Sequence, residues 1–320
     1  MPTALFVSGA VMAFIFGIVV GSFLNVCIYR LPHDESLVTP PSHCPKCNTR
    51  LRSRDLVPMF SFLFLRGRCR YCGVPISWRY ITIEFITGLL YTAFWLALAH
   101  QYPDQIWTNA GLLLVAMAWV FASTMLVTFM IDLDTTYVIE PVTWIAMGAG
   151  LVFELTQKWI TLKDVQFSIG PWTIPYLPAA VPGMVVGFLV FVLMDLFGRL
   201  IFRKPSMGLG DAFIGAAVGA MLGPKVALLS FIIAIVFGAV IGIVLMIAGA
   251  LKKGPAPGSE ETKKKKTPVD DEEELPQGTY MPFGPFITAS ALLVALAPGW
   301  VTTHLSQLWH WWVFQNPFMS

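Results

Sequence analysis

The chain of 320 residues is 56% hydrophobic and only 12% charged, and its formal net charge is +2. Soluble domains carry roughly 25% charged residues, and several apolar stretches here reach the ~20 residues that a membrane-spanning helix requires. The composition therefore excludes an ordinary soluble protein and predicts an all-α polytopic membrane protein. The first apolar stretch continues through Val26 without a cleavage signal, so we expect it to remain as an anchor.

The apolar stretches predict about eight transmembrane helices. They cover residues 5–27, 80–99, 108–131, 138–156, 177–199, 210–223, 226–250 and 283–298. The connection 160–177 and the aromatic-rich C-terminal tail are expected at the membrane surface, because Trp and Tyr favour headgroup depth.

Lysine and arginine are distributed unevenly among the connections. If residues 28–79 are cytoplasmic, alternation across eight spans also places 200–209 and 251–282 in the cytoplasm. These three segments, counted with Arg199 at the edge of one of them, hold eighteen basic residues, against three in the connections on the other side. Because Lys and Arg are enriched in cytoplasmic loops, this orientation is predicted, with both termini on the opposite side.

The charge and apolar patterns divide the chain into five segments. They are a first transmembrane helix at 1–27, a small cytoplasmic zinc-ribbon-like insert at 28–79, a transmembrane core at 80–251, a charged cytoplasmic linker at 252–281, and a last transmembrane helix with an aromatic tail at 282–320. The linker combines Pro, Gly and blocks of like charge, a composition that buries too little apolar area to fold.

Two acidic residues stand where apolar spans meet the predicted cytoplasmic face. Asp132 ends the third span in "TFMIDLDTTYVIEP", and Asp211 opens the sixth in "MGLGDAFIGAAVGA". Because successive spans cross the membrane in opposite directions, Asp132 and Asp211 are both expected at the cytoplasmic face and at the same depth. Packing of their helices would then form a carboxylate pair. Such a pair shares one proton and is suited to general acid–base hydrolysis of a peptide bond. Gly208 and Gly210 allow positive φ and close backbone approach just before the helix start.

Topology alone leaves other interpretations of the acids open. An Asp at a helix start is often an N-cap or an interfacial anchor. Asp134, Glu140, Glu154 and Asp195 are expected to include such residues, although Asp195 is also a candidate member of the pair. A proton-coupled transporter is the alternative function, and it would show acids near the bilayer midplane and inverted repeats. Neither feature is clear in the sequence.

Four of the five cysteines form two Cys-x-x-Cys pairs in the 28–79 insert. Cys44 and Cys47 are separated from Cys69 and Cys72 by twenty-one residues, which is close to the spacing of a Cys₄ zinc ribbon. The cytoplasm is reducing, so a metal site is favoured over disulfides, and a redox dithiol is the alternative. Four thiolates close the coordination shell, so the zinc is predicted to be structural. It would supply ~10 kcal/mol of folding free energy that so short a segment lacks.

Several stretches together resemble the type IV prepilin peptidases, a family of leader peptidases that are often also N-methyltransferases. The similar stretches are "GSFLNVCIYRLP" from Gly21 to Pro32, the paired cysteines with "LRGRCRYCGVPISWRY", then "MIDLDTT", "GLGD" and "MPFGPF". They cover most of the chain in the family's order.

The resemblance implies a membrane aspartic peptidase of the bacterial inner membrane with its active site at the cytoplasmic face. It would cleave the basic leader from prepilins or pseudopilins, with Asp132 and Asp211 as its catalytic residues. Bifunctional members then methylate the new N-terminus with S-adenosylmethionine. The implied partners are prepilin substrates and the lipid bilayer, and no nucleic acid is expected.

The sequence also departs from the family's pattern at the two aspartate motifs. Phe213 stands where a Lys is usual, and Ile139 and Glu140 stand where the family has Pro-Asp. These departures favour, as a further alternative, an inactive scaffold of a pilus or secretion system. The methyltransferase activity rests on the resemblance alone, because the chain has no Gly-rich dinucleotide-binding fingerprint. In the alternative interpretation, the insert only recognises and positions the prepilin.

Overall fold

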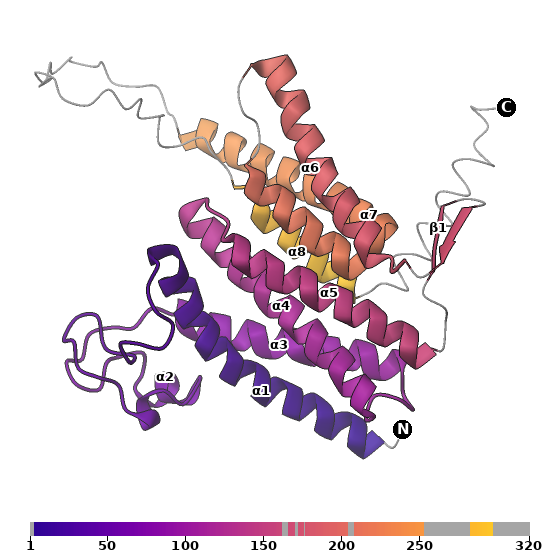
Figure 1. The fold of residues 1–320 in the computed structure, drawn as a ribbon. Coiled ribbons are helices and arrows are strands. Elements are labelled where there is room, and N and C mark those ends of the chain that lie inside the picture. Colours follow the sequence, from indigo (N-terminus) through magenta and orange to yellow (C-terminus); the bar gives the residue numbers. More distant parts are fainter. Residues whose placement is uncertain are drawn as a thin grey trace, which may run out of the picture.

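Helices dominate the computed structural model, which describes residues 3–161, 166–169, 172–175, 177–203, 208–252 and 282–296 (Figure 1). The elements in chain order are α1 (Thr3–Arg30), η1 (Leu31–His33), η2 (Ser53–Asp55), α2 (Phe60–Phe64), α3 (Arg79–Gln101), α4 (Asn109–Thr135), α5 (Glu140–Thr161), β1 (Gln166–Ile169), β2 (Trp172–Pro175), α6 (Ala180–Phe202), α7 (Leu209–Lys252) and α8 (Gly284–Leu296). The predicted linker, beyond Lys252, and the predicted aromatic tail lie outside the described residues.

Five of the described helices are long and apolar enough to cross a membrane. These spans are Thr3–His33, Arg79–Gln101, Asn109–Thr135, Ala180–Ile201 and Leu209–Leu245, and α8 is a shorter apolar helix. The chain is therefore a multi-pass membrane protein, but the predicted number of eight transmembrane helices is not confirmed. The predicted fourth span does form a helix, α5, whose second half carries Glu154, Gln157 and Lys158 and is correspondingly less apolar.

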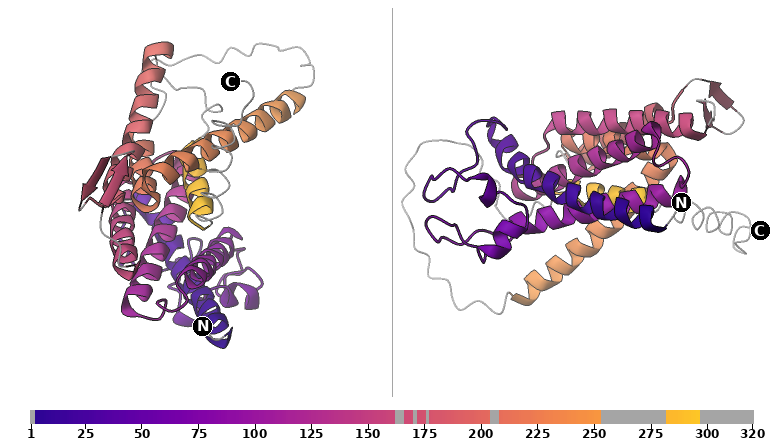
Figure 2. Two further views of the ribbon diagram at one scale, coloured as in Figure 1. Left: turned by 90° about the vertical axis from the view of Figure 1, so that its right-hand side faces the viewer. Right: turned by 90° about the horizontal axis from the view of Figure 1, so that it is seen from below.

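The predicted sixth and seventh spans are continuous in α7 but are separated by a sharp bend. The backbone at Gly223 is not helical, with φ 72° and ψ 169°, and Pro224 follows it. Glycine tolerates this positive φ, and proline lacks the N–H that would continue the helical hydrogen bonding. The bend therefore lies at the predicted boundary between the two spans, and the last part of the segment after it extends away from the other helices (Figure 2).

The predicted surface loop 160–177 contains a short hairpin, so the fold is not purely helical. β1 pairs antiparallel with β2, and Phe167 lies opposite Ile174 in the register. Alternation of polar and apolar residues in "QFSI" and "WTIP" suits strands, a signal that the sequence analysis did not use.

α6 packs against the first segment of α7 with the two backbones in contact. Gly183 and Gly187 of α6 face Gly219 and Gly215 of α7, and a Cβ added to any of the four would overlap a carbonyl oxygen of the opposite helix. Small residues at four-residue spacing are typical of close helix packing in membranes. This contact fixes the beginning of α7 relative to its neighbours.

The apolar core lies where α4, α7 and α8 converge. Phe121 and Leu114 of α4, Ile214 of α7 and Ile287 of α8 are fully buried in one cluster. α1 runs beside α3, with Gly17 against the backbone of Gly88. The helices that carry the predicted acids are therefore in the interior of the bundle.

Candidate active site and metal site

The cysteine-containing insert and the ends of the acid-bearing helices lie at one end of the bundle (Figure 1). The insert, residues 31–78, connects the end of α1 to the start of α3. Arg79 at the start of α3 binds Asp134 at the end of α4, with Nη1 2.9 Å from Oδ1 and a second, shorter bond from Nη2 to Oδ2. The end of α4 therefore lies beside the insert, where the positive-inside prediction placed it.

Asp132 lies in the last turn of α4. Its side chain is in the interior, with the residue only 4% exposed, and Oδ2 has no hydrogen-bond partner among the described residues. The helix ends just beyond it, where Thr136 adopts φ 55° and donates its N–H to the carbonyl of Asp132 at 2.9 Å. A buried carboxylate oxygen without a partner costs stability and therefore points to a functional role.

Asp211 lies in the first turn of α7. The residue is 9% exposed, and its neighbour Ala212 is almost fully buried. The helix start is packed closely against the α4–α5 connection, since a Cβ on Gly210 would lie 2.6 Å from Cβ of Val138. The close approach that Gly210 allows is thus present, and it does not use a positive φ. The glycines with positive φ in the described residues are Gly67, Gly73 and Gly223.

The structure brings the two predicted acids together. Gly284 of α8 lies against Oδ2 of Asp132 and also against Ile214, one turn after Asp211 on α7. The two acids therefore lie near one another, although their helices are far apart in the chain. The buried acids of the described chain are these two and Glu84. We call Asp132 and Asp211 the carboxylate pair. Two negative charges are costly when they lie close together in a buried place, so a pair of this kind favours sharing one proton.

Two of the other acids considered from the sequence have structural partners. Glu154 of α5 accepts the N–H of Ala179 at 2.7 Å and that of Ala180, so it caps the start of α6. Asp195 of α6 accepts a hydrogen bond from Arg199 one turn later, with Oδ2 2.7 Å from Nε. Anchoring roles, expected for some of these acids, fit these contacts.

The positions that depart from the family pattern are accommodated by local contacts. Phe213 packs edge-to-face on Phe188 of α6, with ring centroids 5.6 Å apart. Glu140 is the exposed first residue of α5, and its carbonyl accepts the hydroxyl of Thr143 at 2.7 Å. Neither residue replaces a member of the carboxylate pair.

Two buried charged residues that the sequence analysis did not single out attach the insert to the helices. Glu84, 7% exposed in α3, accepts the N–H of Met59 at 2.7 Å. Arg30 at the end of α1 donates to the carbonyls of Ser36 and Pro40 at 2.7 and 2.6 Å. An acid inside the apolar stretch "ITIEFIT" was the available signal for Glu84.

The four cysteines of the insert converge on one point. Both Cys-x-x-Cys pairs lie in tight turns, in which the N–H groups of Asn48 and Gly73 donate to the carbonyls of Cys44 and Cys69 at 2.8 and 2.9 Å. Gly73 in the second turn has a positive φ of 72°, which glycine tolerates. All four sulfur atoms lie within 4.8 Å of one another, and Sγ of Cys44 lies 3.9 Å from Sγ of Cys72. Zinc bound at ~2.3 Å by four thiolates places its sulfurs about 3.8 Å apart, so the cluster fits that ion.

Polar contacts within the insert affect the Cys47 thiol and connect Asp55 to the second cysteine turn. Contact with the side chain and backbone of Thr49 lowers the pKa of the Cys47 thiol to about 6, which favours the thiolate that a metal binds. Burial acts to raise the pKa of Asp55, but hydrogen bonds from Tyr71 and Arg70 outweigh it and hold that pKa at about 2. Asp55 is therefore ionised at neutral pH and joins η2 to the second cysteine turn.

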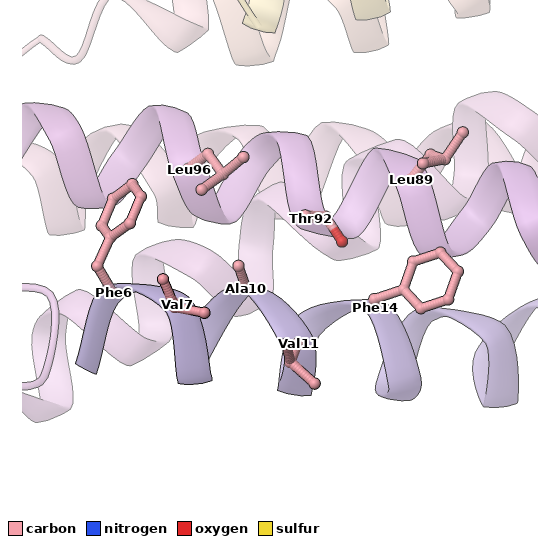
Figure 3. A pocket seen from close by; sticks show the side chains of 8 residues that line it. All are labelled: Phe6, Val7, Ala10, Val11, Phe14, Leu89, Thr92 and Leu96. Atoms are coloured by element: carbon pink, nitrogen blue, oxygen red, sulfur yellow. The ribbon is translucent and has the colours of Figure 1, made fainter. Parts of the chain in front are cut away.

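A groove of about 330 Å³ between α1 and α3 lies away from these sites (Figure 3). Phe6, Phe14, Leu89 and Leu96 line it together with small apolar residues and Thr92. It begins near the N-terminus of α1 and the C-terminus of α3, opposite the insert. Its apolar lining excludes it as a place for acid–base chemistry.

Two family models match the sequence. The "Bacterial Peptidase A24 N-terminal domain" matches residues 15–98, which include α1, the insert and most of α3. The "Type IV leader peptidase family" matches residues 119–243, which include Asp132 and Asp211.

Curated proteins match over most of the chain. A prepilin leader peptidase/N-methyltransferase of Myxococcus xanthus is 30% identical over 333 residues, covering 92% of this chain and 91% of the relative. A protein of the same name from Neisseria gonorrhoeae is 33% identical over 261 residues, covering 74% of this chain and 82% of the relative. A third, from Aeromonas hydrophila, is 34% identical over 263 residues, with 73% and 81% covered. No solved structure matches.

Proposed function

The chain belongs to the type IV leader peptidase family, and from this premise we propose that it cleaves the leader peptide from prepilins or pseudopilins. The observation that supports this most directly is the carboxylate pair. Two acids from the end of α4 and the start of α7 share one buried place and interact. A pair of this kind hydrolyses peptides without a covalent intermediate.

The pair would work by general acid–base catalysis. The ionised carboxylate takes a proton from a water molecule, and the oxygen of that water attacks the carbon of the scissile carbonyl. The protonated carboxyl group donates its hydrogen bond to the carbonyl oxygen and stabilises the charge that develops there. When the C–N bond breaks, a proton passes to the departing amine, and the pair returns to its singly protonated form.

The location of the pair suits a substrate that is itself anchored in the membrane. Asp132 and Asp211 lie at the end of the bundle that holds the insert, and basic residues are concentrated in that segment and in the linker. The positive-inside rule supports the proposal that the pair lies at the cytoplasmic face of the bacterial inner membrane. A prepilin with its apolar helix in the bilayer would present the leader junction there.

The insert would hold a structural zinc ion. Cys44, Cys47, Cys69 and Cys72 supply four sulfur atoms at a suitable separation, and a closed shell of thiolates leaves no position for a reacting water. The contacts of Glu84 and Arg30 attach the metal-stabilised insert to α3 and α1.

The new N-terminus would then be methylated, with S-adenosylmethionine as the methyl donor. This second activity is proposed because relatives covering most of the chain carry both activities in their names. S-adenosylmethionine would supply the methyl group: the amine nitrogen would bond to the methyl carbon, the carbon–sulfur bond would break to leave a neutral thioether, and the amine would lose one proton. We assign no residue to this step.

The transporter alternative is disfavoured by membership of a peptidase family. The scaffold alternative was favoured by Phe213 and Glu140, and both are now explained by packing and helix-start contacts that leave the carboxylate pair in place. Retention of activity is therefore the simpler proposal.

The test is co-expression with a candidate prepilin, followed by mass spectrometry of the pilin N-terminus. The wild type should remove the leader and add one methyl group, whereas Asp132→Asn and Asp211→Asn should each leave the leader attached. Asp134→Asn is the matched control, because Asp134 lies two residues from Asp132 but is exposed and paired with Arg79. Leader removal by either of the first two variants would remove that residue from the proposed site.

A further inference from the structure

The beginning of α8 lies directly against the carboxylate of Asp132. A Cβ added to Gly284, the first residue of α8, would overlap Oδ2 of Asp132 and would lie 3.1 Å from its Cγ. The same Cβ would also lie 3.1 Å from Cδ1 of Ile214 on α7. Only glycine at this position leaves the carboxylate where it is.

The backbone of α8 presents a favourable surface to that carboxylate. The backbone of Gly284 lies in close contact with the carboxyl group of Asp132, and the N-terminal end of a helix attracts negative charge. Oδ2 nevertheless has no hydrogen-bond partner among the described residues, and Thr128, one turn earlier on α4, has an unpartnered buried hydroxyl. The carboxylate is therefore confined by the backbone of α8 but remains free to hold a water or a substrate group.

The first turn of α8 has little freedom to move away. Phe283, just before it, packs on Phe191 of α6 and Phe286 of α8, with both centroid separations 6.3 Å. Thr288 is fully buried and donates to the carbonyl of Gly284 at 3.0 Å. A side chain at position 284 would consequently displace Asp132 rather than α8.

The geometry points to Gly284 as a positioning residue. Because it has no side chain, the start of α8 can lie against the Asp132 carboxylate and hold it in place near Asp211. This inference rests on the proposed function, and it adds α8 as a third element of the site. Gly284 touches no reacting atom, and its effect is transmitted through Asp132. Misplacing a catalytic group by about 1 Å costs roughly 100-fold in rate.

The test is the exchange Gly284→Ala in the full chain, assayed with a purified prepilin. We expect kcat to fall about 100-fold, with KM changed less than about 3-fold because the substrate-binding surface is unchanged. Zinc content and methylation of an already cleaved pilin should stay at the wild-type level. A series through Gly284→Ser and Gly284→Val should deepen the loss as the side chain grows.

The matched control is Gly238→Ala on α7. A Cβ there would lie 3.4 Å from the ring of Phe283, which is an ordinary contact. The added methyl group would therefore contact the residue just before α8 without reaching Asp132. Its kcat should equal that of the wild type. Wild-type kcat in Gly284→Ala, with Asp132→Asn inactive, would overturn this inference alone. Cleavage by Asp132→Asn would instead overturn the proposed function.

A cross-linking measurement keeps the inference testable if Gly284→Ala does not accumulate. Asp132→Cys combined with Gly284→Cys should form a disulfide under mild oxidation, because the two side chains would be within bonding reach. The linked peptides would be identified by mass spectrometry. Asp132→Cys with Gly238→Cys should give no link. Absence of a link between positions 132 and 284 would contradict the contact.

Discussion

The carboxylate pair and the cysteine cluster lie at the same end of the molecule, but they are built in different ways. The cysteines are gathered by two short turns and by contacts within about forty residues of chain. The acids are gathered by helix packing, since Asp132, Asp211 and Gly284 come from α4, α7 and α8. Local geometry forms the first site, whereas the second exists only when the bundle is assembled.

Because the two sites are built differently, their formation depends on different interactions. The four sulfur atoms lie close to one another in a segment with few buried apolar residues, and they could hold a metal ion that stabilises this segment. The acids are held by apolar packing around Ile214 and Ile287 and by the glycine contacts of α6 with α7. Loss of metal should therefore leave the carboxylate pair formed, and loss of helix packing should leave the metal site formed.

The largest expected effect is on the insert. Cys44→Ser or Cys69→Ser should abolish zinc binding and remove ~10 kcal/mol of folding free energy from the insert, which should make residues 34–78 sensitive to protease. The membrane core should unfold at an unchanged temperature. Elemental analysis and limited proteolysis measure the two effects, and Cys27→Ser is the control because Cys27 is buried at the end of α1. Wild-type protein without zinc would contradict the metal site.

A smaller effect is expected from separating α6 and α7. Gly187→Leu should destabilise the protein by about 1–3 kcal/mol through overpacking and should lower cleavage by displacing the start of α7, while zinc stays bound. Thermal unfolding, cleavage and zinc content measure the three quantities. Gly148→Leu is the control, because nothing lies within 4 Å of a Cβ at that glycine. Loss of zinc in Gly187→Leu would show that the two sites are not independent.

The smallest effect is expected at the ion pair between the start of α3, where the insert ends, and the end of α4. Arg79 and Asp134 are both partly exposed, and exposed pairs contribute about 0.2–1 kcal/mol. A double-mutant cycle with Arg79→Gln and Asp134→Asn should give a coupling free energy in that range and leave cleavage within about 3-fold of wild type. A coupling several times larger would mean that the insert and the carboxylate pair act as one unit.

Much of this organisation could be predicted from the sequence, because the signals are strong and local. Long apolar stretches define helices, and the spacing of Cys44, Cys47, Cys69 and Cys72 brings four ligands together in the structure as expected. Gly223 and Pro224 stand at the boundary between the sixth and seventh predicted spans. The meeting of Asp132 and Asp211 was inferred from membrane depth, which is set by topology alone.

The remaining features depend on which helix faces meet, and hydropathy does not encode that. The role of Gly284 is visible only when α8 is placed against α4. The buried contact of Glu84 with Met59 can be found only when it is known that the insert folds back onto α3. The predicted number of eight spans is not confirmed, because five described helices are long and apolar enough to cross a membrane and two predicted spans form the bent α7.

The most direct test of the carboxylate pair is a double-mutant cycle on leader cleavage. Rates would be measured for Asp132→Asn, for Asp211→Asn and for the variant carrying both. If the two acids share one proton and act as a unit, each single exchange should lower the rate about 10³-fold, and the double exchange should lower it no further. Losses that multiply in the double variant, or a single variant with wild-type rate, would contradict the account.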